Sequence, residues 1–126
     1  GRSFYTDALD RPKSAYETAL VRDLIGFVDA TFQTIPSRAG RVIGGLSMGG
    51  YGALKLAFKH PDMFCAAVSH SGAAAFASHK FQESEEWDRE WIPVFGQNPQ
   101  GGPEDVFVHP ARITDRLRPG RLFASR

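Results

Sequence analysis

One serine in this sequence has the surroundings of a nucleophile. Ser47 lies in Gly45-Leu46-Ser47-Met48-Gly49, which has the spacing G-x-S-x-G. An apolar run precedes these residues and a helical pattern follows them, and in that setting the spacing places a serine on a sharp strand-to-helix turn. The hydroxyl would then project above the edge of a sheet, where it could attack an acyl carbonyl carbon.

The neighbours of Ser47 support the same chemistry. A Cβ at Gly45 or Gly49 would crowd the turn, so both positions favour glycine. We expect the backbone N–H of Met48 to stabilise the negative charge that develops on the carbonyl oxygen during attack. The competing interpretation is a glycine-rich turn that carries an idle serine. The strand before the motif and the helix after it favour the nucleophile.

A serine nucleophile needs a base, and the base needs an acid to orient it. The candidates that follow Ser47 are His60, His70, His79, His109, Asp62, Asp88, Asp105 and Asp115. Most have a plain structural alternative: His60 ends a helix, and Asp105 could pair with His109 on one helix face. His70 follows a predicted strand on the side where a site would open, so it is a candidate for the pocket wall.

The first predicted helix packs one face on a core. Apolar residues recur at helical spacing from Tyr16 to Phe32, which indicates an amphipathic helix. Ser14 and Glu17 have the spacing of a capping box, in which each side chain accepts a free N–H of the first turn.

A strand, a helix and a strand follow in the order of a βαβ unit. Residues 41–46 form an apolar run without alternation, which predicts a strand buried on both faces, as in a parallel sheet covered by helices. Residues 49–59 predict a helix, and residues 64–69 predict a second strand parallel to the first. A third strand begins near residues 121–124. The predicted fold class is α/β, with a central parallel sheet flanked by helices.

The segment between the second and third strands is less regular. Residues 83–92 predict a short helix that carries Trp87 and Trp91, and residues 109–117 predict another. Loops at the carboxyl ends of strands carry function in open α/β sheets. Two roles are therefore open for Trp91 and for Tyr5: the wall of a substrate pocket, or an anchor that holds the chain on the core.

Composition excludes several classes of protein. The 126 residues have the size of one domain, with ordinary hydrophobic (42%) and charged (23%) fractions. A net charge of +1 gives no basic footprint for nucleic acid, and no apolar run is long enough to cross a membrane. The single cysteine, Cys65, excludes an internal disulfide, and no Cys/His cluster has zinc-ligand spacing. We expect no metal and no cofactor.

Several segments together resemble the esterase branch of the α/β-hydrolases. They are Phe4-Tyr5-Thr6-Asp7, Asp29-Ala30-Thr31-Phe32, residues 45–54, Lys59-His60-Pro61-Asp62 and Ser69-His70-Ser71-Gly72-Ala73. That branch includes S-formylglutathione hydrolases, tributyrin and feruloyl esterases, and mycolyltransferases of the antigen 85 type. The resemblance implies a mostly parallel sheet and a Ser–acid–His triad in that chain order. Ser47 matches the nucleophile, and Met48 matches an oxyanion-hole donor.

The resemblance also implies that parts of the family's fold lie outside these residues. In the family the acid and the histidine follow the strand that begins here near Leu122, and a second oxyanion donor precedes the segment that matches. We therefore expect residues 1–126 to be a single incomplete α/β-hydrolase domain, the portion that carries the nucleophile, with its N- and C-terminal parts missing. Its open sheet edge would be filled by those parts or by another copy in a homo-oligomer.

The predicted function is hydrolysis of a small-molecule carboxylic ester or thioester through an acyl-serine intermediate. Transfer of the acyl group to an alcohol, as in the mycolyltransferases, is an alternative that the sequence does not separate from hydrolysis. A catalytically inactive fragment that serves as a folding or interaction module is another.

Overall fold

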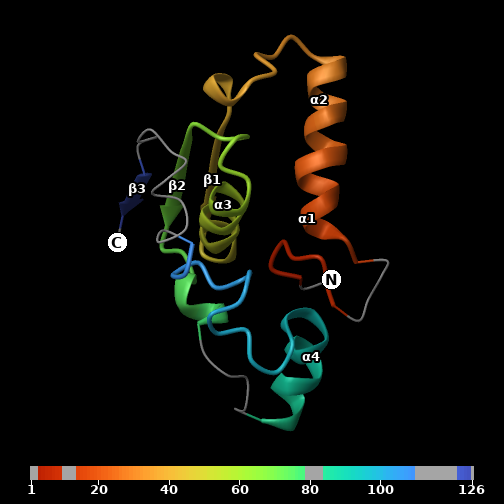
Figure 1. The fold of residues 1–126 in the computed structure, drawn as a ribbon, viewed down its shortest axis with the longest axis vertical. Coiled ribbons are helices and arrows are strands. Elements are labelled where there is room, and N and C mark those ends of the chain that lie inside the picture. The colour runs from red at the N-terminus through yellow and green to blue at the C-terminus, as the bar shows by residue number, and fades with distance from the viewer. Residues whose placement is uncertain (1–2, 10–13, 79–83, 110–121, 126) are drawn as a thin grey trace.

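Three parallel strands and their flanking helices form the part of the chain that the structure describes (Figure 1). The computed structural model describes residues 3–9, 14–78, 84–109 and 122–125. The strands, in sheet order, are β1 (Val42–Leu46), β2 (Ala66–His70) and β3 (Leu122–Ser125). Both pairings are parallel, and Leu46 lies opposite His70 at the carboxyl ends of β1 and β2. The predicted parallel pairing and the third strand are confirmed.

Helix α3 (Met48–Lys59) follows β1 after a single residue and covers one face of the sheet. Its residues from Gly50 to Leu56 are buried. The helix packs closely on the strand ends because Gly50 has no side chain. A Cβ there would lie 2.7 Å from the Ser69 hydroxyl oxygen and 2.7 Å from the Cα of Gly72.

The opposite face of the sheet is exposed in the described part of the chain. Val42 and Leu46 are 62% and 63% exposed, and Val68, which pairs with Gly44, is exposed on the same face. The prediction that both faces of residues 41–46 are buried is wrong for these residues, because α3 covers only one of them. No described strand pairs with the outer edge of β1. Occupation of that edge by another copy stays a prediction.

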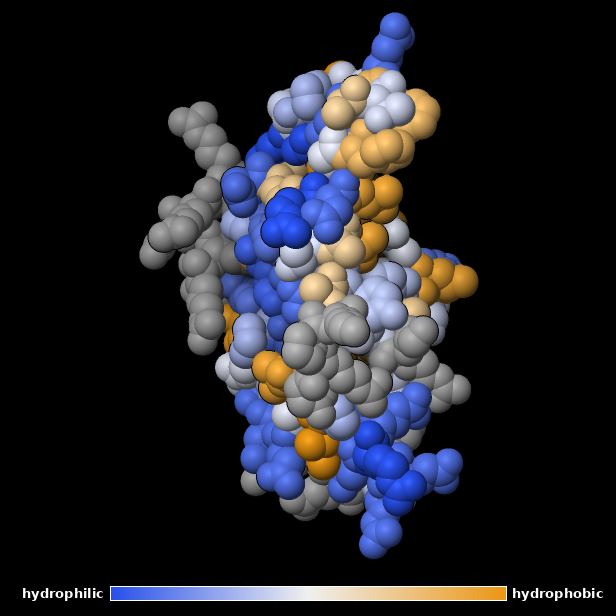
Figure 2. Space-filling model, turned by 90° about the vertical axis from the view of Figure 1, so that its right-hand side faces the viewer, coloured by the Kyte–Doolittle hydropathy of each residue, from blue (hydrophilic) through white to orange (hydrophobic). Residues whose placement is uncertain are grey.

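Residues 16–31 form one long helix beside α3 (Figure 1). It comprises α1 (Tyr16–Thr18), a π-helical segment (Ala19–Leu24) and α2 (Ile25–Thr31). The predicted helix is confirmed, but its apolar stripe is only partly covered, since Tyr16 and Leu24 are exposed. Figure 2 shows hydrophobic and hydrophilic surface side by side on this side of the molecule. No helix in the described residues is long and apolar enough to span a membrane.

The start of this helix is not the predicted capping box. Its N-cap residue is Ala15, which makes no side-chain capping bond. Asp7, from the preceding loop, takes that role: its Oδ1 accepts the N–H of Thr18 at 3.0 Å, and its Oδ2 accepts the Thr18 hydroxyl. The side chain of Glu17 is buried and binds Lys59 and His60 at the end of α3 instead.

Helix α4 (Glu85–Phe95) supplies part of an aromatic core. The prediction of a helix over residues 83–92 is confirmed, although the helix continues past Pro93. Phe4 stacks on Phe76 with ring centroids 4.0 Å apart and meets Trp91 edge-on at 5.0 Å. Two short 3₁₀ turns, Arg38–Gly40 and Ala74–Ala77, complete the elements. Apart from His109, the helix predicted over residues 109–117 lies outside the described residues.

Candidate active site

Ser47 occupies the turn between β1 and α3 in a strained conformation. Its φ is 53° and its ψ is −115°, in a region that residues other than glycine rarely adopt. Backbone hydrogen bonds hold it there: its N–H donates to His70 O at 2.9 Å, and its carbonyl accepts from Tyr51 N at 3.1 Å and from Ala73 N at 3.2 Å. The predicted sharp strand-to-helix turn at Ser47 is confirmed.

The two motif glycines differ in what surrounds them. A Cβ at Gly45 would lie 2.2 Å from the carbonyl carbon and oxygen of Gly49, which is closer than real Cβ contacts come. A Cβ at Gly49 would meet only the hydroxyl of Tyr5, at 3.6 Å, an ordinary contact distance. The predicted crowding is therefore confirmed at Gly45 and wrong at Gly49, whose open side faces Tyr5 rather than the turn.

The two glycines give a matched pair of substitutions. We expect Gly45→Ala to lower the free energy of unfolding by about 1–3 kcal/mol, since the backbone of Gly49 must move. Gly49→Ala should leave it unchanged or raise it by up to about 1 kcal/mol, because alanine is the better helix former. Urea unfolding of the two variants measures both effects. Equal losses would contradict the difference in crowding.

A second strained serine lies beside Ser47. Leu46 and His70 are the last residues of β1 and β2 and pair with each other. Ser47 and Ser71 come directly after them and therefore lie at the same end of the sheet. Ser71 has φ 46° and is exposed. The His70 side chain is also exposed, while its carbonyl accepts the N–H of Ser47. The sequence pointed to His70 at this strand end but gave no signal for Ser71, since a left-handed serine has no characteristic pattern.

Met48 is the first residue of α3. Its backbone N–H is one of the first-turn donors that have no acceptor within the helix. The partial positive charge of a helix N-terminus lies at the same point. The structure thus places this N–H next to Ser47 in the chain, on the carboxyl side of the sheet, where an oxyanion donor would be needed.

In the described part of the chain, no histidine forms a hydrogen bond with the Ser47 hydroxyl. His60 Nε2 lies 2.9 Å from Glu17 Oε1, and His109 Nε2 lies 2.7 Å from Pro103 O. Both rings are therefore engaged elsewhere. Two further candidates of the sequence, His79 and Asp115, lie outside the described residues.

Asp105 holds its own loop together. Its carboxylate accepts hydrogen bonds from the Ser78 hydroxyl at 3.0 Å, from Gly101 N at 2.9 Å and from Phe107 N at 3.0 Å. The predicted alternative that pairs Asp105 with His109 therefore has no support in the contacts of either residue. No group of three or more His, Cys, Asp or Glu side chains that could hold a metal occurs among the described residues.

Tyr5 and Trp91 lie in different surroundings. Trp91 is 3% exposed and belongs to the aromatic core, which supports the anchor role for it. Tyr5 is half-buried and lies along α3, where it lines a hollow of about 210 Å³ with Ile43, Gly49 and other residues. The Tyr5 ring thus reaches the start of α3, next to the turn that carries Ser47.

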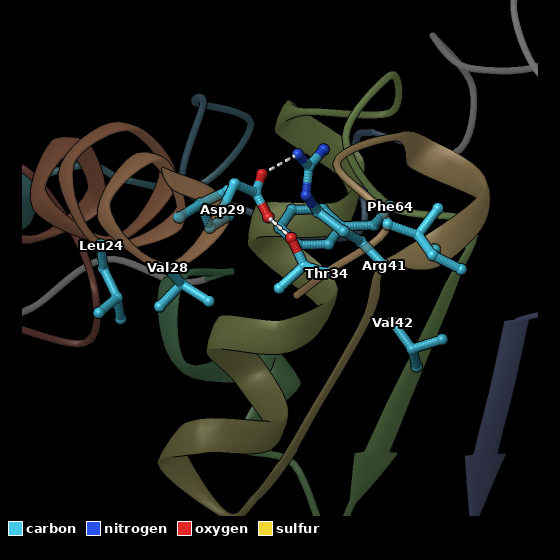
Figure 3. A pocket seen from close by; sticks show the side chains of 10 residues that line it. Leu24, Val28, Asp29, Thr34, Arg41, Val42 and Phe64 are labelled. Carbon is cyan, nitrogen blue, oxygen red and sulfur yellow. Dashed lines mark hydrogen bonds and ion pairs between the residues drawn. The ribbon is translucent and has the colours of Figure 1, made fainter. Parts of the chain in front are cut away.

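A second hollow, of about 300 Å³, lies at the other end of β1 (Figure 3). Its wall includes Leu24, Val28 and Phe64, and an ion pair joins Arg41 to Asp29 beside it. Ligands of open α/β sheets bind at the carboxyl ends of the strands. This hollow lies at the amino end of β1, so we do not assign it to the site.

A buried network of charges surrounds Lys55 of α3. The Lys55 side chain has no exposed surface, and its Nζ donates to Tyr5 O at 2.7 Å, to Thr6 Oγ1 at 2.8 Å and to Glu104 Oε2 at 2.9 Å. Glu17 Oε2 lies 3.2 Å away from the same Nζ. Lysine is rarely buried without such partners.

Lys59, one turn further along α3, joins the same two carboxylates. Its Nζ donates to Glu17 Oε2 at 2.8 Å and to Glu104 Oε1 at 2.7 Å. Burial opposes ionisation of both carboxyls, but Lys55 and Lys59 outweigh it and lower the pKa of Glu17 and the pKa of Glu104. The sequence contained one signal for this network, two lysines spaced i,i+4, but gave no acceptors for them.

Comparison with known proteins assigns the chain to a family. The family described as "Putative esterase" matches residues 3–106. The chain belongs to this esterase family. Over 60 residues it is 43% identical to Esterase Rv1288 of Mycobacterium tuberculosis, a match that covers 48% of this chain and 13% of that protein.

Two solved structures share the fold of this chain. FphF, a fluorophosphonate-binding serine hydrolase of Staphylococcus aureus, superposes with a TM-score of 0.77 at 21% identity, over 97% of this chain and 47% of that one. An S-formylglutathione hydrolase of Agrobacterium tumefaciens gives a TM-score of 0.68 at 22% identity, over 97% and 42%. The fold of this esterase-family chain is thus part of an α/β-hydrolase fold, and the chain spans less than half the length of these structures.

Proposed function

We propose that this chain carries the nucleophile of a serine hydrolase that cleaves small-molecule carboxylic esters or thioesters. The observation that carries the proposal is Ser47, held with a positive φ between β1 and α3 at the carboxyl edge of the sheet. Membership of an esterase family supports ester hydrolysis in general. The assignment of Ser47 rests on the geometry of the turn and on the G-x-S-x-G spacing.

The proposed reaction proceeds in two steps. A base removes the proton of the Ser47 hydroxyl, and the oxygen attacks the carbonyl carbon while the N–H of Met48 stabilises the oxyanion. The alcohol or thiol leaves with the proton, and an acyl-serine remains. Water, activated by the same base, then attacks the acyl group, which releases the acid and restores the Ser47 hydroxyl. This chemistry calls for no cofactor.

We further propose that the base and its acid come from residues beyond this chain. Two observations support this: the rings of His60 and His109 bind other groups, and the chain spans 47% of FphF. The resemblance to the esterase branch implies that the acid and the histidine follow β3 in the sequence. Residues 1–126 would then be one incomplete α/β-hydrolase domain.

A fluorophosphonate probe tests the proposal, because it modifies only an activated serine. We expect the full-length protein that contains this chain to be labelled on the peptide that carries Ser47, as found by mass spectrometry. Ser47→Ala should prevent labelling, whereas Ser71→Ala, which changes the neighbouring strained serine, should not. Labelling that survives Ser47→Ala would refute the proposal, and no labelling of the parent protein would favour an inactive interaction module.

A further inference from the structure

Tyr5 lies along α3 with its hydroxyl toward the end that carries Ser47. A Cβ on Gly52 would lie 2.3 Å from the ring carbon Cδ2 of Tyr5, whereas a Cβ on Gly49 would lie 3.6 Å from the Tyr5 hydroxyl. Gly49 precedes Gly52 by about one helical turn. The ring therefore runs from the second turn of α3 to the first, where Met48 begins the helix. In the described part of the chain the Tyr5 hydroxyl has no hydrogen-bond partner.

The backbone that presents this ring is strained. Phe4 has φ 50° and Tyr5 has φ 59°, so two successive residues other than glycine adopt left-handed angles. Such conformations persist only where the surroundings hold them, and they cluster at functional sites. The Phe4 ring is fixed in the aromatic core. The Tyr5 carbonyl is fixed by Lys55 Nζ at 2.7 Å.

The role of Lys55 differs from that of Lys59. Both lysines contact the carboxylates of Glu17 and Glu104, but Lys59 does so while remaining partly exposed. A partly exposed lysine is therefore sufficient to pair with the two carboxylates. The complete burial of Lys55, which is energetically costly, needs another explanation. The contacts that distinguish Lys55 are those to the Tyr5 carbonyl and to Thr6 in the same loop.

We infer that Tyr5 contacts the substrate in the Ser47 site and that Lys55 is its positioning residue. The inference rests on the function proposed above. The Tyr5 hydroxyl donates a hydrogen bond to an oxygen of the bound ester and so helps to hold it over Ser47. Lys55 acts only through the backbone of Tyr5, which it fixes from inside the protein.

Kinetics of Tyr5→Phe in the full-length protein test the first half of the inference. The variant keeps the ring on Gly52 and removes only the hydroxyl. We expect kcat/KM for p-nitrophenyl acetate to fall about ten-fold, the effect of one lost neutral hydrogen bond. The melting temperature should stay the same, and the fluorophosphonate probe should still label Ser47. An unchanged kcat/KM would overturn the inference.

Lys55→Met and Lys59→Met form a matched pair for the second half. Each removes a lysine that pairs with the same carboxylates, but only Lys55→Met frees the Tyr5 carbonyl. We expect Lys55→Met to lower kcat/KM about ten-fold, with no further loss when Tyr5→Phe is added. Lys59→Met should stay within about two-fold of the parent at a comparable loss of stability. Equal losses of activity in the two lysine variants would show that the network has only a structural role. That result would overturn the inference that Lys55 positions Tyr5.

Two controls keep the outcomes separate. Should Lys55→Met fail to fold, Lys55→Gln replaces it in the same comparison with Lys59→Gln, because glutamine is shorter than lysine and keeps a polar end in the buried network. An active Ser47→Ala protein would refute the proposed function itself. An inactive Ser47→Ala protein together with a fully active Tyr5→Phe protein would refute only the inference about Tyr5.

Discussion

Ser47→Ala should abolish ester hydrolysis by the full-length protein. The Ser47 hydroxyl is the atom that forms the proposed acyl intermediate, and removal of such a serine costs on the order of a million-fold in kcat in a well-studied protease. What remains comes from the oxyanion donors and from binding. Hydrolysis of p-nitrophenyl acetate measures the loss. Circular dichroism should show an unchanged fold, because Ser47 is exposed and its side chain makes no capping bond.

The 126 residues by themselves should show no turnover above background. Without a base the Ser47 hydroxyl is an ordinary alcohol, and two of the described histidines, His60 and His109, bind other groups. Turnover by this segment that disappears on Ser47→Ala would mean that one of its own histidines completes the site. An active Ser47→Ala full-length protein would mean that Ser47 is not the nucleophile.

The features that the sequence predicted well are local ones. The G-x-S-x-G spacing, the apolar run before it and the helical pattern after it all lie within residues 41–59. Such patterns specify a strand, a turn and a helix with little help from distant residues. The positive φ of Ser47 belongs to that unit. The parallel pairing of β1 with β2 follows from the strand–helix–strand order. Even here the motif predicted the same crowding at Gly45 and Gly49, whereas in the structure a Cβ would be crowded only at Gly45.

The features that it missed depend on residues far apart in the chain. Glu17 fits a capping box by spacing, but its carboxylate meets Lys59, 42 positions away. Lys55 finds its partners in the loop at Tyr5 and in Glu104, on either side of it in sequence. Local sequence patterns do not predict such tertiary contacts. A buried lysine must be paired, and its partners come from distant segments. The exposed face of β1 has a similar cause, since burial depends on which elements lie nearby.

The network around Lys55 connects four separate segments: the loop at Tyr5, the long helix at Glu17, α3, and the loop at Glu104. Lys55 and Lys59 lie on α3, the helix that follows Ser47. The network is most sensitive to the loss of one carboxylate, since two lysines would then share the other.

Glu104→Ala should destabilise the protein more than the glycine and serine substitutions do. The change leaves buried Lys55 with Glu17 as its remaining carboxylate, and removing one partner of a buried ion pair costs about 3–5 kcal/mol. Asp23→Ala is the matched control. It breaks the Arg22–Asp23 pair, which has a similar length of 2.8 Å but is exposed on both sides, and exposed pairs contribute at most about 1 kcal/mol. Urea unfolding at pH 7 compares the two variants.

The pH dependence of stability provides a second test of the same network. The folded-state pKa values of Glu17 and Glu104 lie below the ordinary value of 4.5 because Lys55 and Lys59 outweigh the cost of burial. A carboxyl with a lowered folded pKa stabilises the protein above its unfolded pKa, and this contribution is lost as the pH falls through the folded value. The parent protein should therefore lose stability on acidification below about pH 4.5.

Glu104→Ala lacks one of the two carboxyls, so its free energy of unfolding should fall less steeply with acidification than that of the parent. The two curves of free energy against pH should converge in acid. Curves that stay parallel down to low pH would show that the network contributes nothing to stability through its charges.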